Sequence, residues 1–113
     1  MALDKIKHGD ITVLTPKKDL MGGDETEELE KEAREIAGQG HPKIVIDLGK
    51  VSYVNSTGLG SLASIHVTCQ KAEGWMRLAR TTRRIKNLFL ITKLNMVFDS
   101  YDSVEDAKAE LEK

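Results

Sequence analysis

Apolar residues form short runs along the chain, and glycine or proline separates most of these runs from longer stretches with helical periodicity. Two such runs, at about residues 3–8 and 11–15, lie on either side of Gly9 and Asp10. A two-residue link of this kind is typical of a β-hairpin, so we expect an antiparallel pair of strands there. Pro16, which has no backbone N–H to donate, ends the second strand.

Helical and strand patterns alternate through the rest of the chain. Apolar residues at helical spacing predict a helix at about 26–37 that ends at Gly38. The continuous, largely β-branched run at 43–48 predicts a strand that is covered on both faces. The same patterns predict five later elements: a helix that follows Asn55-Ser56-Thr57-Gly58 and runs to about Glu73, a strand at 75–79, a helix at about 82–92, a strand near 96–98, and a last helix that opens at Ser103.

Strands that alternate with helices after an opening hairpin indicate an α/β fold, with a mixed β-sheet flanked by helices. No internal repeat, linker or low-complexity segment divides the sequence, so we expect residues 1–113 to form a single domain. A chain of 113 residues is long enough to build one hydrophobic core without a metal ion or a disulfide.

Composition and charge exclude several classes of protein. The chain is 40% hydrophobic and 31% charged, a balance typical of a folded domain rather than a disordered one. Its net charge of −1 argues against direct nucleic-acid binding, which needs a basic surplus. The longest apolar run, residues 88–91, is too short to span a membrane. With one cysteine, and no apolar signal-peptide core in residues 1–5, we expect a cytoplasmic protein.

The segment from Asp47 to Gly60 carries the most chemical information. It is predicted as a strand, a short connection and the start of a helix, and it contains Asn55, Ser56 and Thr57. One of these three side chains can accept a hydrogen bond from the first free N–H groups of the helix and act only as a cap. Alternatively, an exposed hydroxyl at the helix N-terminus could carry a phosphate, because the helix dipole favours negative charge there. The residues alone leave both interpretations open.

This segment resembles the signature of STAS domains, and specifically that of bacterial anti-sigma factor antagonists. The resemblance rests on Asp47-Leu48, Val51, Tyr53-Val54 and Asn55-Ser56-Thr57-Gly58-Leu59-Gly60. Residues 73–78, 85–94, 97–98 and 105–107 are also similar to the later parts of the family pattern. The resemblance implies a STAS fold, a mixed sheet with helices packed mainly on one face.

The resemblance also implies a function, that of a binding module with no catalysis and no cofactor or metal of its own. Family members of this size bind an anti-sigma factor that is also a serine kinase, and binding frees the sigma factor until the motif serine is phosphorylated. That serine corresponds to Ser56, with Thr57 as the second choice. The residues expected to contact the partner are Asn55, Ser56, Thr57, Gly58, Leu59 and Asp24.

Two positions differ from the best-known family pattern. Asn55 stands before the serine where aspartate is frequent, and Met21 stands where the family usually has an acidic residue. Asp24 and Asp19 are the candidates to replace that acid. One alternative is a non-switching STAS subunit of a transporter or stress-signalling complex, which would not need the serine. Another is a small phosphotransfer or nucleotide-handling enzyme, which would need acidic metal ligands near Ser56.

Charged and metal-ligating residues elsewhere in the chain suggest weaker hypotheses. Residues 24–35 hold seven carboxylates and two cations, whereas residues 77–93 hold six cations and no acid. Both are typical of solvated helix faces, and either could instead steer a charged partner. His66 and Cys69 share one helix face, but a metal site normally needs three or four ligands, so we expect none.

Overall fold

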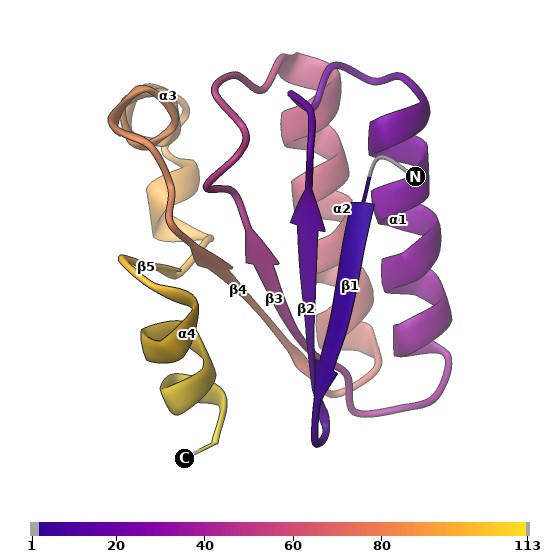
Figure 1. Ribbon diagram of the computed structural model, residues 1–113. Helices are drawn as coiled ribbons and strands as arrows, with labels where there is room; N and C mark the ends of the chain where they lie inside the picture. Colours follow the sequence, from indigo (N-terminus) through magenta and orange to yellow (C-terminus); the bar gives the residue numbers. More distant parts are fainter. Residues whose placement is uncertain (1–2, 113) are drawn as a thin grey trace.

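The structure, a computed structural model, describes residues 3–112. Its elements follow the predicted alternation of strands and helices (Figure 1). In chain order they are β1 (Leu3–His8), β2 (Ile11–Pro16), α1 (Asp24–Ala37), β3 (Lys43–Asp47), α2 (Ser56–Lys71), β4 (Trp75–Ala79), α3 (Arg83–Thr92), the 3₁₀ turn η1 (Leu94–Met96), β5 (Ser100–Tyr101) and α4 (Val104–Leu111).

The five strands form one mixed sheet in the order β1-β2-β3-β4-β5. The hairpin prediction is confirmed, because β1 pairs antiparallel with β2, and Gly9 turns between them with a φ of +64°. The pairs from β2 to β5 are all parallel. Parallel strands bring their carboxyl ends to one edge of the sheet, together with the loops that lead into the helices.

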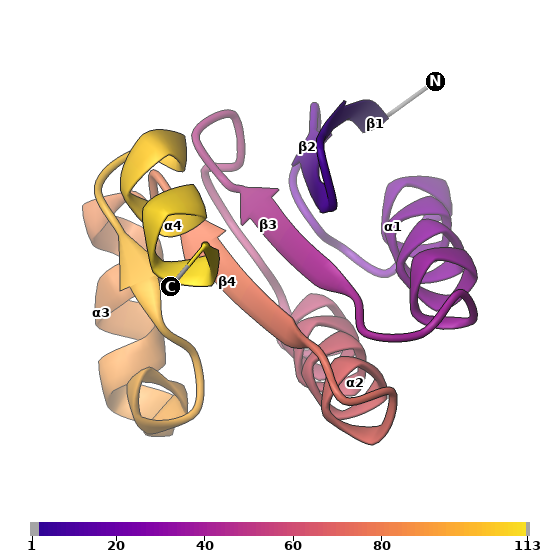
Figure 2. The same ribbon diagram turned by 90° about the horizontal axis from the view of Figure 1, so that it is seen from below.

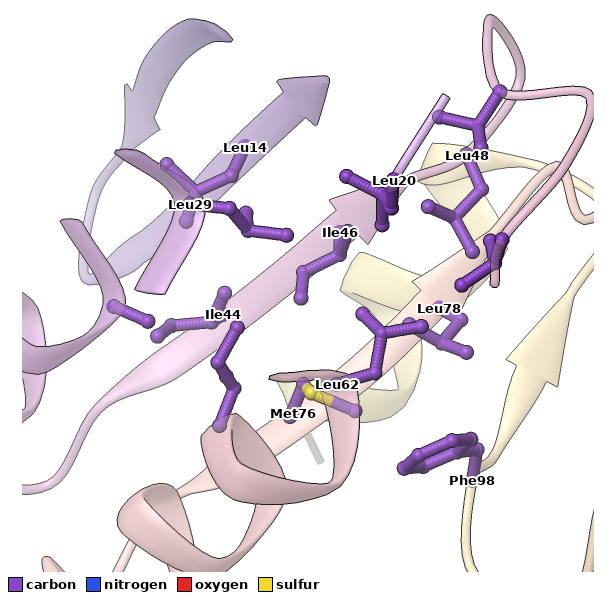
Figure 3. Packing of buried hydrophobic residues seen from close by; sticks show 14 of the residues in the cluster. Leu14, Leu20, Leu29, Ile44, Ile46, Leu48, Leu62, Met76, Leu78 and Phe98 are labelled. Carbon is purple, nitrogen blue, oxygen red and sulfur yellow. The ribbon is translucent and has the colours of Figure 1, made fainter. Parts of the chain in front are cut away.

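The helices cover the sheet unequally. Helices α1 and α2 lie on one face, whereas α4 lies on the opposite face (Figures 1 and 2). The larger core cluster draws side chains from α1, α2 and α3 and includes Ile44 and Ile46 of β3 (Figure 3). Val45, between them, belongs to a smaller cluster under α4. The prediction that this strand is covered on both faces is therefore confirmed. Within residues 3–112, no helix has both the length and the apolarity needed to cross a membrane.

The prediction of a strand near residues 96–98 is wrong. Lys93 takes a left-handed conformation after α3, and residues 94–96 then form the turn η1, so the short strand β5 comes later, at Ser100–Tyr101. The apolar run does not mark a buried strand, because Met96 is 82% exposed. Phe98 alone is buried, and its ring packs edge-on against that of Phe89, with 5.3 Å between centroids.

Candidate functional site

The first turns of α1, α2 and α3 gather at the edge of the domain where β2, β3 and β4 end (Figure 1). The residues singled out from the sequence lie at this edge, in the two loops that precede α1 and α2 and in the first turns of those helices. The loops meet through a parallel bridge between Leu20 and Val54. We call the surface formed by residues 19–24 and 52–59 the Ser56 edge.

Asn55 is the N-cap of α2, a role that the sequence left open among three residues. Its side-chain oxygen accepts a hydrogen bond from the Gly58 N–H at 2.9 Å. Its amide nitrogen donates to the Met21 carbonyl at 3.0 Å, and its backbone N–H donates to the Leu20 carbonyl at 3.1 Å. An aspartate could form the cap but has no amide N–H for the Met21 carbonyl. Asn55, which stands where aspartate is frequent in the family, therefore joins the two loops through a hydrogen bond that aspartate could not donate.

Ser56 and Thr57 are the first two residues of α2, and both are exposed. The expectation that this motif lies at a strand-to-helix junction with an accessible serine is confirmed. Gly58 is buried behind them, and Leu59 is partly buried against the larger core cluster. A hydroxyl at this position is open to solvent and to another protein.

The loop before α1 is closed by its own side chains. Glu25 accepts hydrogen bonds from the backbone N–H groups of Met21 at 3.0 Å and Gly23 at 3.3 Å, and the Thr26 hydroxyl accepts from Gly22 at 3.0 Å. These donors, that of Met21 first, lower the pKa of the Glu25 carboxyl. Met21 is exposed, so the position where the family usually has an acid presents an apolar side chain to solvent.

The two candidate replacements for that acid are placed differently. Asp24 is exposed at the start of α1, on the Ser56 edge. Asp19 instead holds the other loop, because one of its carboxylate oxygens accepts from the backbone N–H groups of Ser52 at 2.8 Å and Tyr53 at 3.2 Å. The Ser52 hydroxyl donates to the same carboxylate at 3.0 Å. Sequence reasoning did not find this contact.

The Asp19 clamp predicts a pH-dependent contribution to stability. Hydrogen bonds, led by that from the Ser52 N–H, lower the pKa of Asp19 in the folded protein. Its contribution is therefore present above about pH 4, near the unfolded-state pKa, and is lost as the pH falls through the lower folded-state value. We expect Asp19→Ala to cost about 1 kcal/mol at pH 7.

Urea denaturation across a pH series would measure this effect. The difference between wild type and Asp19→Ala should shrink below about pH 4. Asp102→Ala is the matched control, because the Asp102 side chain is 92% exposed and its ion pair with Lys86 is long, at 3.5 Å. A constant difference down to strongly acidic pH would contradict the clamp.

His66 and Cys69, which share α2, are not part of a metal-binding cluster among the described residues. Within residues 3–112, no three His, Cys, Asp or Glu side chains lie together in a way that could hold a metal ion. Cys69 is buried, and burial raises its pKa to about 11, so its thiol is inert at neutral pH. His66 packs edge-on against Phe98 instead, with 6.1 Å between ring centroids.

The proteins that this chain resembles in sequence and in structure carry related names. The model of the STAS domain family matches residues 2–107. A Thermotoga neapolitana protein that carries the name of an anti-sigma factor antagonist is 27% identical over 105 residues, which are 91% of this chain and 91% of that protein. The crystal structure of a Thermotoga maritima protein with the same designation superposes with a TM-score of 0.89 at 20% identity, covering 98% of this chain and 95% of the other. The phosphorylated form of SpoIIAA, a Bacillus cell fate determinant, gives a TM-score of 0.74 at 15% identity, covering 96% and 98%.

Proposed function

The chain belongs to the STAS domain family, and we propose that it is a cytoplasmic anti-sigma factor antagonist that phosphorylation of Ser56 switches off. In its unphosphorylated form it binds an anti-sigma factor that is also a serine kinase, and the sigma factor is released. The protein is a binding module, and the kinase performs the only catalysis. Relatives that carry the name of anti-sigma factor antagonists support the general role.

The exposure of Ser56 at the first position of α2 is the observation that carries this proposal. A kinase can reach the hydroxyl without unfolding the helix. The free N–H groups and dipole of the first helical turn favour the added negative charge. SpoIIAA, which has the same fold, has itself been observed in a phosphorylated form.

The switch acts through the interface rather than through the fold. A phosphate adds about −1.5 to −2 charges at neutral pH. In the free protein this charge stays in water at a helix end that tolerates it. Against a docked partner it would lose hydration, and an uncompensated buried charge costs several kcal/mol. The bound state is therefore the one that phosphorylation destabilises.

Phosphate mapping tests the proposal directly. Wild-type and Ser56→Glu baits would be used to isolate the protein from native lysate that binds only the wild type. The purified partner would then be incubated with ATP and wild type, Ser56→Ala or Thr57→Ala. We expect mass spectrometry to place phosphate on Ser56 in the wild type and Thr57→Ala and to find none in Ser56→Ala.

Other outcomes assign the protein differently. Phosphate on Thr57 alone would overturn the assignment of Ser56. Binding without phosphorylation, in a complex with a transporter or stress-signalling protein, would support a non-switching STAS subunit instead.

A further inference from the structure

A hollow beside the Ser56 edge lies between the loop that precedes α2 and helix α3. Figure 1 shows this loop rising between α2 and α3. The hollow has a volume of about 150 Å³, several times what one water molecule occupies in the liquid. Its lining residues are Tyr53, Arg84, Ile85, Asn87, Leu88 and Ile91.

The lining combines an apolar floor with a fixed cation. The Arg84 guanidinium lies over the Tyr53 ring, 4.7 Å from its centroid, in a cation–π contact. Arg84 also helps to lower the pKa of Asp19, so its charge acts on the Ser56 edge. Ile91, on the same side of α3, is 80% exposed. Tyrosine and arginine are enriched among the residues that contribute most to binding in protein interfaces, and both line this hollow.

The hollow is continuous with the Ser56 edge. The Tyr53 N–H is held by Asp19, and Tyr53 precedes Ser56 by three residues. Three residues of extended chain span at most about 11 Å, so the two Cα atoms are closer than the width of a small protein interface. A protein interface of ordinary size centred on Ser56 is therefore wide enough to include Tyr53 and the Arg84 guanidinium that lies over its ring.

The charges around the hollow restrict what can dock there. Arg83 and Arg84 are consecutive and exposed at the start of α3. A symmetric contact with a second copy whose twofold axis passed through the hollow would place these cations against each other, because near the axis a residue faces its own copy. A partner surface with an acidic and an apolar side chain instead complements both features.

We propose that the anti-sigma factor contacts this hollow together with Ser56, placing a carboxylate against Arg84 and an apolar side chain against Leu88 and Ile91. This inference rests on the proposed function and extends the footprint of the partner from α2 onto α3. It also explains why a phosphate would act so strongly. A partner that brings acidic groups to Arg84 is repelled by a dianion placed nearby on Ser56.

Affinity measurements with matched variants test the footprint. The probe is the purified kinase that binds the wild type but not Ser56→Glu. We expect Arg84→Glu to weaken binding at least tenfold and Ile91→Ser at least fivefold. The melting temperature of Ile91→Ser should stay that of the wild type because Ile91 is 80% exposed. Arg84→Glu also loses the contact with Tyr53 and faces Asp19, so its binding is compared at a temperature where its melting curve shows it fully folded. Lys93→Glu and Met96→Ser make equivalent changes at exposed positions outside the hollow, and they should bind within twofold of the wild type.

Salt dependence adds a second measurement. Association of the wild type should slow as ionic strength rises, and the slope should be smaller for Arg84→Glu because the attractive charge is gone. If Arg84→Glu and Ile91→Ser bind the kinase with wild-type affinity while Ser56→Glu does not bind it, the proposed footprint is wrong and the proposed function still stands. Wild type phosphorylated on Ser56 that binds the kinase as tightly as the unphosphorylated wild type would instead overturn the proposed function.

Vesicles containing phosphatidylglycerol distinguish a membrane from a protein partner. We expect the wild type to remain in the supernatant when such vesicles are sedimented. Sedimentation of the wild type but not of Arg84→Glu would assign the basic and apolar residues of α3 to an anionic lipid surface and would overturn the proposal.

Discussion

Ser56→Asp is expected to bind the anti-sigma factor at least tenfold more weakly than the wild type, whereas Ser56→Ala should bind normally and resist being switched off. Tenfold corresponds to about 1.4 kcal/mol of binding free energy. A full phosphate carries more charge than aspartate, and a thousandfold loss needs only about 4 kcal/mol. Titration calorimetry with the purified kinase would measure the affinities of the wild type, the phosphorylated wild type, Ser56→Asp and Ser56→Ala.

The fold of these variants should change little. A negative charge in the first turn of a helix is stabilising by about 0.3–1 kcal/mol. Ser56 is exposed, and it is Asn55, not Ser56, that caps the helix. We therefore expect Ser56→Asp to melt at the wild-type temperature or slightly above it, which separates a loss of binding from a loss of structure.

Ser64→Asp is the control for charge alone. Ser64 is exposed and lies further along α2, away from the Ser56 edge. The Ser64→Asp variant should bind the kinase with an affinity within twofold of that of the wild type. Equal weakening by aspartate at residues 56 and 64 would mean that net charge, rather than a specific contact at Ser56, controls binding.

Local patterns were sufficient to predict most of the fold. The glycine at the hairpin turn, the helical spacing in α1 and the continuous apolar run of β3 each depend on neighbouring residues, and each is confirmed. The prediction of a strand near residues 96–98 is wrong because apolar residues in a sequence need not be buried in the fold. There the left-handed Lys93 redirects the chain, and only Phe98 enters the core.

Within the Ser56 edge, sequence placed the helix start but not the contacts that hold it. The N-cap was limited to three residues because short polar side chains before a helix are strong local signals. The hydrogen bonds that Ser52 donates to Asp19 and that Asn55 donates to Met21 join residues more than thirty positions apart. Nothing in the local sequence specifies such pairs, since they depend on how β2 and β3 align in the sheet.

Gly58→Ala should destabilise the protein and disturb this edge at the same time. A Cβ at residue 58 would lie 2.3 Å from the Leu20 carbonyl oxygen and 2.7 Å from a methyl group of Val54. A backbone carbonyl cannot move aside as a flexible side chain can, so the two loops must separate. Such overpacking typically costs about 1–3 kcal/mol, and the gain from replacing a helical glycine by alanine, about 1 kcal/mol, offsets only part of it.

Gly60→Ala is the matched control and is expected to change stability in the opposite direction. Gly60 lies two residues further along α2, is exposed, and would place its Cβ in open space. It should therefore show only the gain in helix propensity, about 0.5–1 kcal/mol. Urea denaturation would measure the free energy of unfolding of both variants, and a stabilised Gly58→Ala would contradict the close approach of Leu20 to α2.

Gly58→Ala should also weaken kinase binding without adding any charge, because the Leu20 carbonyl that it displaces also accepts the hydrogen bond from the Asn55 N–H. Gly60→Ala should leave kinase binding unchanged.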